Sequence, residues 1–252
     1  MPTFIDPEGD KNLIFNMIPD CKRILYKVSG ECLMGTGGHG YCVETMRKIA
    51  CDIKRVHNNG VQICLVVGGG NIYRGAYGEK IGMDRAVADY MGMLATIMNA
   101  MALQNILEQE GVATRVQSAI PMMVVAESYV RRRAMRHLEK GRVVIFAAGT
   151  GNPFFTTDTT ATLRALEMGC DYMFKGTSVD GIYSEDPKIN PNATRFQTIS
   201  HQELIEKNLR IMDITAVSMA RDRKMPIVVF SIKQENALEC VIAGQCNYTI
   251  VR

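Results

Sequence analysis

Residues 62–71 read Gln62-Ile63-Cys64-Leu65-Val66-Val67-Gly68-Gly69-Gly70-Asn71. The run from Ile63 to Val67 is apolar without polar alternation, which is typical of a strand covered by helices on both faces. Three glycines follow at the point where such a strand ends. The segment therefore predicts a strand of a parallel sheet and a turn at its carboxyl end, the edge where open α/β sheets bind ligands.

Working outward, short β-rich runs alternate with longer helical patterns, as in βαβ units. We expect strands near 23–28, 61–67, 112–117, 142–148, 171–175 and 226–232. We expect helices near 43–57, 84–110, 128–139, 158–168, 201–207, 213–223 and 235–243. The predicted fold class is α/β with a mostly parallel central sheet. No repeat or long linker divides the chain, so we expect a loose N-terminal extension over 1–21 and a single domain over 22–252.

The charge of the chain excludes some classes of function. The formal net charge is only +3 and is spread along the chain, and the basic cluster at 131–136 fits a solvated helix face. We therefore expect no nucleic-acid partner. The first 21 residues carry four acidic side chains and lack a long apolar stretch. Since this is unlike a signal peptide or a membrane anchor, we predict a cytoplasmic protein with no membrane partner.

Cysteine and histidine spacing gives no sign of a disulfide framework or a metal site. Eight cysteines lie mostly inside apolar runs and never as Cys-x-x-Cys, at positions 21, 32, 42, 51, 64, 170, 240 and 246. We expect them to be reduced thiols. Four scattered histidines form no zinc-binding pair, so no protein-bound metal is predicted.

The predicted helix at 84–110 is apolar on more than one side. Its apolar residues include Met91, Met93, Leu94, Ile97, Met98, Met101, Leu103, Ile106 and Leu107. Such a helix must be buried on several sides, either in the core of a monomer or against a second subunit. The pattern leaves both possibilities open.

Three predicted strands end in glycine- and hydroxyl-rich turns. These turns are Ser29-Gly30, Gly68-Gly69-Gly70-Asn71, and Gly149-Thr150-Gly151-Asn152-Pro153-Phe154-Phe155-Thr156-Thr157-Asp158. Glycine lets backbone N–H groups approach phosphate oxygens, and the helix starts behind the turns add positive potential. With Lys27 and Arg74 beside them, the turns predict a phosphate-binding edge.

Two common nucleotide-binding motifs are excluded. Gly35-Thr36-Gly37-Gly38-His39-Gly40 matches Gly-x-Gly-x-x-Gly, but it does not directly follow a strand and no acidic residue ends a second strand about 20 positions later. A Walker A loop needs a Gly-Lys dipeptide, which the sequence lacks. Phosphate chemistry here must belong to another fold.

Phosphoryl transfer suits the residues at this edge. It needs in-line positioning and compensation of negative charge rather than covalent chemistry by the protein. An acceptor phosphate is already largely ionised and needs no general base. Lys27 is the best candidate for the cation that bridges donor and acceptor. Asp158 would orient such a lysine or hold Mg²⁺ through water, or it would cap the following helix, a role that Thr156 and Thr157 could also fill.

At these residues the chain resembles the bacterial uridylate kinases of the amino acid kinase family, over about Lys22 to Val251. The motifs that carry the resemblance are Arg23 to Glu31, Gly68 to Gly75, Met91-Gly92-Met93-Leu94-Ala95-Thr96, and the turn from Gly149 to Asp158. The last is the most specific. The resemblance implies a three-layer αβα sandwich, a reaction of ATP and Mg²⁺ with UMP that gives UDP and ADP, and a homo-oligomer, a hexamer built from dimers.

The resemblance also assigns residues to substrates, one by one. ATP would be met by Lys27, Val28, Ser29, Gly30, Gly70, Arg74, Thr177, Tyr183 and Asp186. UMP would be held by Gly69, Asp89, Thr150, Gly151, Asn152, Pro153, Phe154, Phe155, Thr156 and Thr157. Lys27, Asp158, Asp213 and Arg74 would be catalytic, with no metal ligand from the protein, because Mg²⁺ is carried by the ATP phosphates.

The resemblance gives mixed indications about regulation by nucleotides. Gly35, Thr36, Gly37, Gly38, His39 and Gly40 lie where the family has a segment tied to activation by GTP, but Gln104 and Glu108 replace basic residues found in some members. A glutamate would repel a triphosphate. UTP would inhibit by using the UMP site.

Two rival functions remain. One is a kinase of the same fold with a carboxylate or carbamate acceptor, which would need a cationic clamp rather than a nucleotide pocket. The other is a nucleotide-binding regulator without turnover, which would be expected to lose Lys27, Asp158 or Asp186.

Overall fold

The computed structural model describes residues 18, 21–187, 189–209 and 211–252. The expected N-terminal extension, 1–21, lies outside the described residues except for Ile18 and Cys21. In the described part of the chain, nine strands form one sheet in the order β4-β3-β5-β2-β1-β6-β10-β11-β9. These strands are β1 (Arg23–Val28), β2 (Gln62–Val67), β3 (Thr114–Ser118), β4 (Glu127–Ser128), β5 (Val143–Ala147), β6 (Tyr172–Thr177), β9 (Thr198–Ile199), β10 (Ile227–Ser231) and β11 (Tyr248–Val251).

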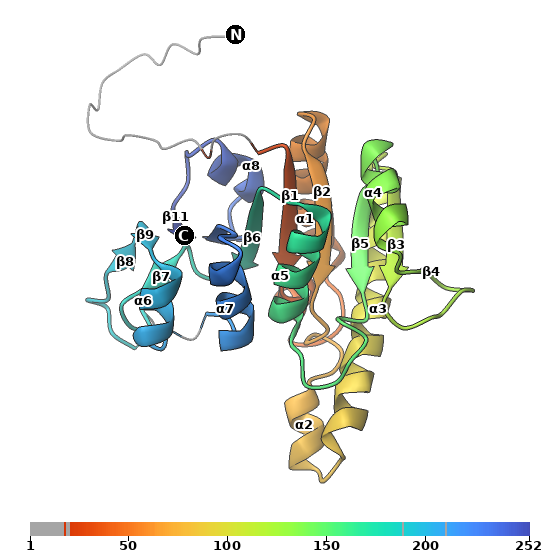
Figure 1. Ribbon diagram of the computed structural model, residues 1–252, viewed down its shortest axis with the longest axis horizontal. Coiled ribbons are helices and arrows are strands. Elements are labelled where there is room, and N and C mark those ends of the chain that lie inside the picture. Colours follow the sequence, from red (N-terminus) through yellow and green to blue (C-terminus); the bar gives the residue numbers. More distant parts are fainter. Residues whose placement is uncertain (1–17, 19–20, 188, 210) are drawn as a thin grey trace.

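The sheet is mostly parallel, as predicted. Every neighbouring pair of these strands is parallel except β10 and β11. The helices are α1 (Val43–Asn58), α2 (Gly75–Lys80), α3 (Arg85–Gln109), α4 (Arg131–Glu139), α5 (Thr157–Met168), α6 (His201–Glu206), α7 (Ile214–Asp222) and α8 (Ala237–Ile242), with a short 3-10 helix at Gly30–Met34. Figure 1 shows them on both sides of the strands, with α2 and the start of α3 extending beyond the sheet.

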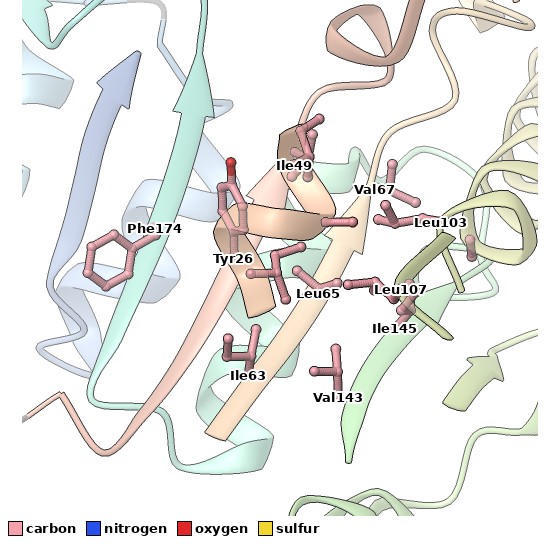
Figure 2. Close-up of a cluster of buried hydrophobic side chains, with 14 of the residues drawn as sticks. Tyr26, Ile49, Ile63, Leu65, Val67, Leu103, Leu107, Val143, Ile145 and Phe174 are labelled. Atoms are coloured by element: carbon pink, nitrogen blue, oxygen red, sulfur yellow. The ribbon is translucent and has the colours of Figure 1, made fainter. Parts of the chain in front are cut away.

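Two hydrophobic cores, one on each face of the sheet, make the three-layer αβα sandwich. Alternate residues of each strand enter opposite cores: Tyr26 and Leu65 pack toward α1, α3 and α8, whereas Leu25 and Val66 pack toward α4, α5 and α7. Figure 2 shows the first core, where side chains of β1, β2 and β5 meet Ile49 of α1 and Leu103 and Leu107 of α3. Burial on both faces explains why the strands are apolar without alternation.

The elements missing from the sequence prediction are short or poorly encoded, and they include β11 (Tyr248–Val251), which has four residues. β4, β9 and the separate hairpin of β7 (Ile182–Tyr183) and β8 (Arg195–Phe196) have two residues per strand, too few for a periodic signal. Helix α2 contains Gly75 and Gly78, which lower helix propensity. It forms because it packs against α3.

One prediction about cysteine was wrong. Cys240 and Cys246 form a disulfide across a sequence separation of 6. Helix α8 ends at Ile242 and the chain reverses at Gly244, whose φ is 71°, so the two Cα atoms come within 5.5 Å. A Cys-x₅-Cys spacing does not reveal such a reversal. Six cysteines are free, and of these Cys64 and Cys170 are the buried core thiols that were expected.

Helix α3 is long and apolar enough to cross a membrane by length and composition alone. The same composition serves burial in the protein, because Met93, Ile97, Ala100, Leu103 and Leu107 all lie in the first core.

A buried carboxylate fixes helix α8 to helix α1. Asp52 is 7% exposed and accepts hydrogen bonds from the backbone N–H groups of Leu238 (2.8 Å) and Glu239 (3.4 Å). The N-cap residue of α8, Asn236, makes no side-chain capping bond. Asp52 therefore caps α8 from another helix.

Replacing this cap should lower stability without touching the ligand edge. We expect Asp52→Ala to cost about 1–2 kcal/mol in the free energy of unfolding, as for other lost caps, measured by urea denaturation. Asp52→Asn keeps an acceptor oxygen and should lose less. Equal losses for both variants would show that the hydrogen bonds are not what Asp52 contributes.

Candidate active site

The parallel strands bring the predicted turns to one edge. Ser29-Gly30 follows β1, Gly68 to Asn71 follows β2, and the 149–156 turn follows β5. A Cβ atom on Gly30 would lie 2.6 Å from both the Gly68 carbonyl oxygen and the Gly70 nitrogen. The first two turns are therefore packed backbone against backbone, which only glycine permits.

Helix α3 supports two of these turns. Buried Asn99 donates to the Gly68 carbonyl (2.6 Å) and to the Asn71 side chain (2.7 Å). Thr96 Oγ1 accepts the backbone N–H of Ala148 (2.9 Å), whose φ is 60°, at the start of the third turn. A Cβ on Gly69 would lie 2.9 Å from Ala95 Cβ and from the Gly92 carbonyl oxygen. The sequence motif from Met91 to Thr96 thus packs against the second turn and hydrogen-bonds to the start of the third.

Lys27 and Asp158 lie beside each other at this edge. Lys27 Nζ lies 2.9 Å from Asp158 Oδ1, and the two side chains are 8% and 15% exposed. The contact is therefore an ion pair between two largely buried side chains. Asp158 does not cap α5, because Thr156 Oγ1 accepts the N–H groups of Asp158 (3.1 Å) and Thr159 (3.2 Å). The carboxylate is left for the lysines.

A second lysine, Lys175 of β6, shares Asp158. Its Nζ donates to Asp158 Oδ2 (2.6 Å) and to the Ile211 carbonyl (2.6 Å). Burial raises the pKa of Asp158, but the two ammonium groups outweigh burial and hold that pKa below its usual range. Burial lowers the pKa of Lys175 to about 8, against the opposite pull of Asp158.

The sequence analysis did not single out Lys175, although a signal existed. It lies in the buried strand Tyr172–Thr177, and a lysine inside a buried strand is rare unless it is paired. Asn99 was also missed, and Thr96 was quoted only as part of the family motif, without a role. They are polar residues inside an apolar helix, and their partners are more than 25 residues away in the sequence.

Asp213 is linked to the ligand edge by hydrogen bonds from threonine hydroxyl groups. It caps α7 by accepting the Ala216 N–H (2.9 Å), and it also accepts hydrogen bonds from Thr159 Oγ1 (2.8 Å) and Thr156 Oγ1. It therefore ties the start of α7 to the start of α5. The expected orientation of a lysine by Asp213 is not a direct contact here, but a field effect on Lys175.

Asp89 of α3 meets the third turn. Its carboxylate accepts the N–H of Phe154 (2.7 Å), whose φ is 72°, and pairs with Arg85 (2.9 Å). This bond holds a backbone conformation that side chains disfavour. Phe154 and Phe155 are 69% and 50% exposed, so two aromatic rings stand free at the rim of the turn.

The remaining predicted residues surround these turns. Arg74 follows the second turn and forms an ion pair with Glu31. Gly40 exchanges hydrogen bonds with Asn71, which joins the 35–40 segment to the same turn. Thr177 ends β6, where its hydroxyl donates to the Val179 carbonyl (2.7 Å). Tyr183 donates to Asp180 (2.7 Å) within the β7 segment, and Asp186 follows in the loop between β7 and β8.

A cavity of about 520 Å³ adjoins this edge between α6 and α7. Asp158, Leu204, Ile211, Met212 and Asp213 line part of it. The edge therefore combines two buried lysine side chains, three glycine-containing turns, two exposed aromatic rings and an adjacent cavity with apolar lining residues. These groups suit a ligand that carries both phosphates and a planar base.

Comparisons with known proteins agree with this arrangement. The chain is 56% identical over 230 residues to a uridylate kinase of Rickettsia bellii, covering 91% of this chain and 96% of that protein. It is 54% identical to a uridylate kinase of Cereibacter sphaeroides, over 92% of this chain and 94% of that protein. Its fold matches the crystal structure of UMP kinase from Bacillus anthracis with a TM-score of 0.89 at 35% identity, over 92% and 96% of the two chains.

UMP kinase from Ureaplasma parvum gives a TM-score of 0.88 at 37% identity, over 92% of this chain and 99% of that chain. The family model described as the amino acid kinase family matches residues 22–231. This match takes in the Lys27, Asp158 and Lys175 cluster and the three turns around it. The chain therefore belongs to the amino acid kinase family.

Proposed function

We propose that this chain is a UMP kinase, which transfers the γ-phosphoryl group of ATP to UMP and gives UDP and ADP. The observation that carries the proposal is the buried Lys27–Asp158 pair at the edge where three glycine-containing turns meet. The high identity to uridylate kinases supports UMP as the acceptor.

The site residues divide into a donor side and an acceptor side. Lys27, Val28, Ser29, Gly30, Gly70, Arg74, Thr177, Tyr183 and Asp186 are proposed to bind ATP. Gly69, Asp89 and the 150–157 turn are proposed to bind UMP. Lys27 is proposed to lie between the donor and acceptor phosphates, where its ammonium would offset charge on the phosphoryl group as it moves in line. Arg74 would leave Glu31 for a phosphate oxygen, an exchange that costs little because the pair is exposed.

Magnesium enters the proposal as part of the substrate. Mg²⁺ would arrive bound to ATP phosphates and offset their charge, as in other phosphoryl transfers. Asp158 is committed to two lysines. Its contribution is to set the place of those cations. The acceptor phosphate needs no general base, because it is already largely ionised near neutral pH.

We also propose a homo-oligomer whose contact includes α3. Val87, Tyr90, Leu94, Met98 and Met101 are exposed at spacings of three and four residues, so they form one apolar stripe on the face opposite Asn99. A stripe of this kind is typical of a protein interface. A hexamer built from such dimers, residence in the cytoplasm and a single catalytic unit over 22–252 complete the proposal.

Effectors are proposed from the same surfaces. UTP would inhibit by entering the UMP site. Glu108, near the end of α3, pairs with Arg115 of β3 (3.2 Å), so this anionic side chain offsets the charge of that arginine. This supports the interpretation that Glu108 would disfavour a triphosphate bound beside it, and whether GTP activates stays open.

The acceptor is tested by offering MgATP with UMP, CMP, dUMP or acetylglutamate and measuring ADP formation. We expect turnover with UMP far above the others, and Lys27→Met should lower kcat by about 10²–10³-fold, as for loss of one transition-state donor. Acetylglutamate as the best acceptor would establish the carboxylate-kinase alternative. A folded Lys27→Met protein with near-normal turnover would remove Lys27 from the mechanism.

The support of the third turn by Thr96 can be tested separately. Thr96→Val keeps the shape but leaves the Ala148 N–H without its acceptor. Since this turn is proposed to hold UMP, we expect KM for UMP to rise about tenfold, equivalent to about 1.4 kcal/mol, with KM for ATP little changed. Thr96→Ser keeps the oxygen and serves as the control. Equal rises in both KM values would contradict a role confined to the acceptor side.

The α3 contact is tested by the mass of the particle in solution. Leu94→Glu places a charge in the centre of the stripe, where burial against a second copy would be costly. We expect a smaller assembly by light scattering after size exclusion. Val43→Glu, which alters an equally exposed apolar residue on α1, is the control. An unchanged mass for Leu94→Glu would place the contact elsewhere.

A further inference from the structure

Two lysines on neighbouring strands face one carboxylate. Lys27 of β1 and Lys175 of β6 are paired in register, so their side chains point to the same face of the sheet. Asp158, from the first turn of α5, lies between them, with one oxygen for each ammonium group. All three side chains are largely buried.

The two lysines are not held in the same way. Lys175 is fixed by two hydrogen bonds of 2.6 Å, to Asp158 Oδ2 and to the Ile211 carbonyl. In the described part of the chain Lys27 has one such partner, Asp158 Oδ1, at 2.9 Å. Lys175 is therefore the more firmly anchored ammonium group, with two partners, and Lys27 is the less restrained one, with a single partner.

This difference matters for a cation that must meet phosphate. A buried lysine that is the sole partner of a carboxylate forms a neutral pair with it. At about 3 Å in a poorly hydrated site, the electrostatic attraction would hold the ammonium group against that carboxylate. When a second ammonium group contacts the same carboxylate, the negative charge is shared between two lysines and each lysine is held less strongly. The second ammonium group also fixes the carboxylate, so that Asp158 cannot turn both oxygens toward Lys27.

We propose that Lys175 is a positioning residue, which holds Asp158 so that Lys27 stays available to the transferred phosphoryl group. The proposal rests on the proposed phosphoryl transfer and adds a residue to it. Lys175 acts through Asp158, and its contact with Ile211 ties the same carboxylate to the segment before α7.

A role for the charged form of Lys175 makes kcat/KM depend on pH. The charged groups around Lys175 are Asp158 of α5, Lys27 of β1 and Asp213 at the start of α7. Its pKa of about 8 is below the ordinary value of 10.5, so Lys175 is charged at neutral pH and loses its proton as pH rises through about 8. Because kcat/KM reports the free enzyme, kcat/KM for MgATP should fall above pH 8.

The test begins with the wild-type protein, since absence of UDP formation there would overturn the proposed function itself. With wild-type turnover established, Lys175→Met should lower kcat/KM by about 100-fold and remove the decline above pH 8. Its melting temperature should fall but the protein should still fold, because Asp158 keeps Lys27 as its partner while the Ile211 carbonyl loses its donor. The control is Lys54→Met, which removes the surface pair with Glu110 and should keep full activity.

A double-mutant cycle then separates action through Asp158 from direct action. In an Asp158→Asn background, adding Lys175→Met should cost less than about fivefold, because the carboxylate that Lys175 restrains is already gone. A cost near 100-fold in both backgrounds would overturn the inference, as would a Lys175→Met enzyme within threefold of wild type. If Lys175→Met does not fold, absence of the decline in wild-type kcat/KM above pH 8 would overturn it.

Discussion

The structure depends on the need to hold buried positive charge at one edge of a parallel sheet. Lys27 and Lys175 stand on neighbouring strands that are otherwise apolar, and both are 7% exposed. Such charges are stable only when they are paired and hydrogen-bonded. Asp158 supplies the pairing, and Thr156 caps α5 so that Asp158 need not. The start of α5 is placed so that it brings this carboxylate to both lysines.

Helix α3 connects the remaining parts. Its buried face carries Thr96 and Asn99, which hold two of the turns, and Asp89 near its start holds Phe154 of the third. Its outer face carries the apolar stripe. A displacement of α3 would therefore move both the glycine turns and the proposed subunit contact. This dual use explains why the helix is apolar on several sides yet contains polar residues that never reach solvent.

Much of this architecture was readable from the sequence because it is encoded locally. Apolar runs gave the strands, glycine turns gave the ligand edge, and the 149–158 turn indicated the family. Contacts across the chain were not readable in the same way. Lys175 meets Asp158 from 17 residues away, Asp52 caps a helix 186 residues away, and Cys240 meets Cys246 only because the chain reverses. A residue's type was visible in the sequence, but its partner depended on the topology.

The identity of the N-cap shows how a local ambiguity is resolved by distant groups. Thr156, Thr157 and Asp158 can all cap a helix, and residue preference alone slightly favours aspartate. The two buried lysines decide the matter, because a carboxylate beside two ammonium groups gains more than one beside backbone N–H groups. Threonine then takes the cap, and its hydroxyl also reaches Asp213. The start of α5 is thus organised by charges on β1 and β6, and those same charges make the edge suitable for phosphate.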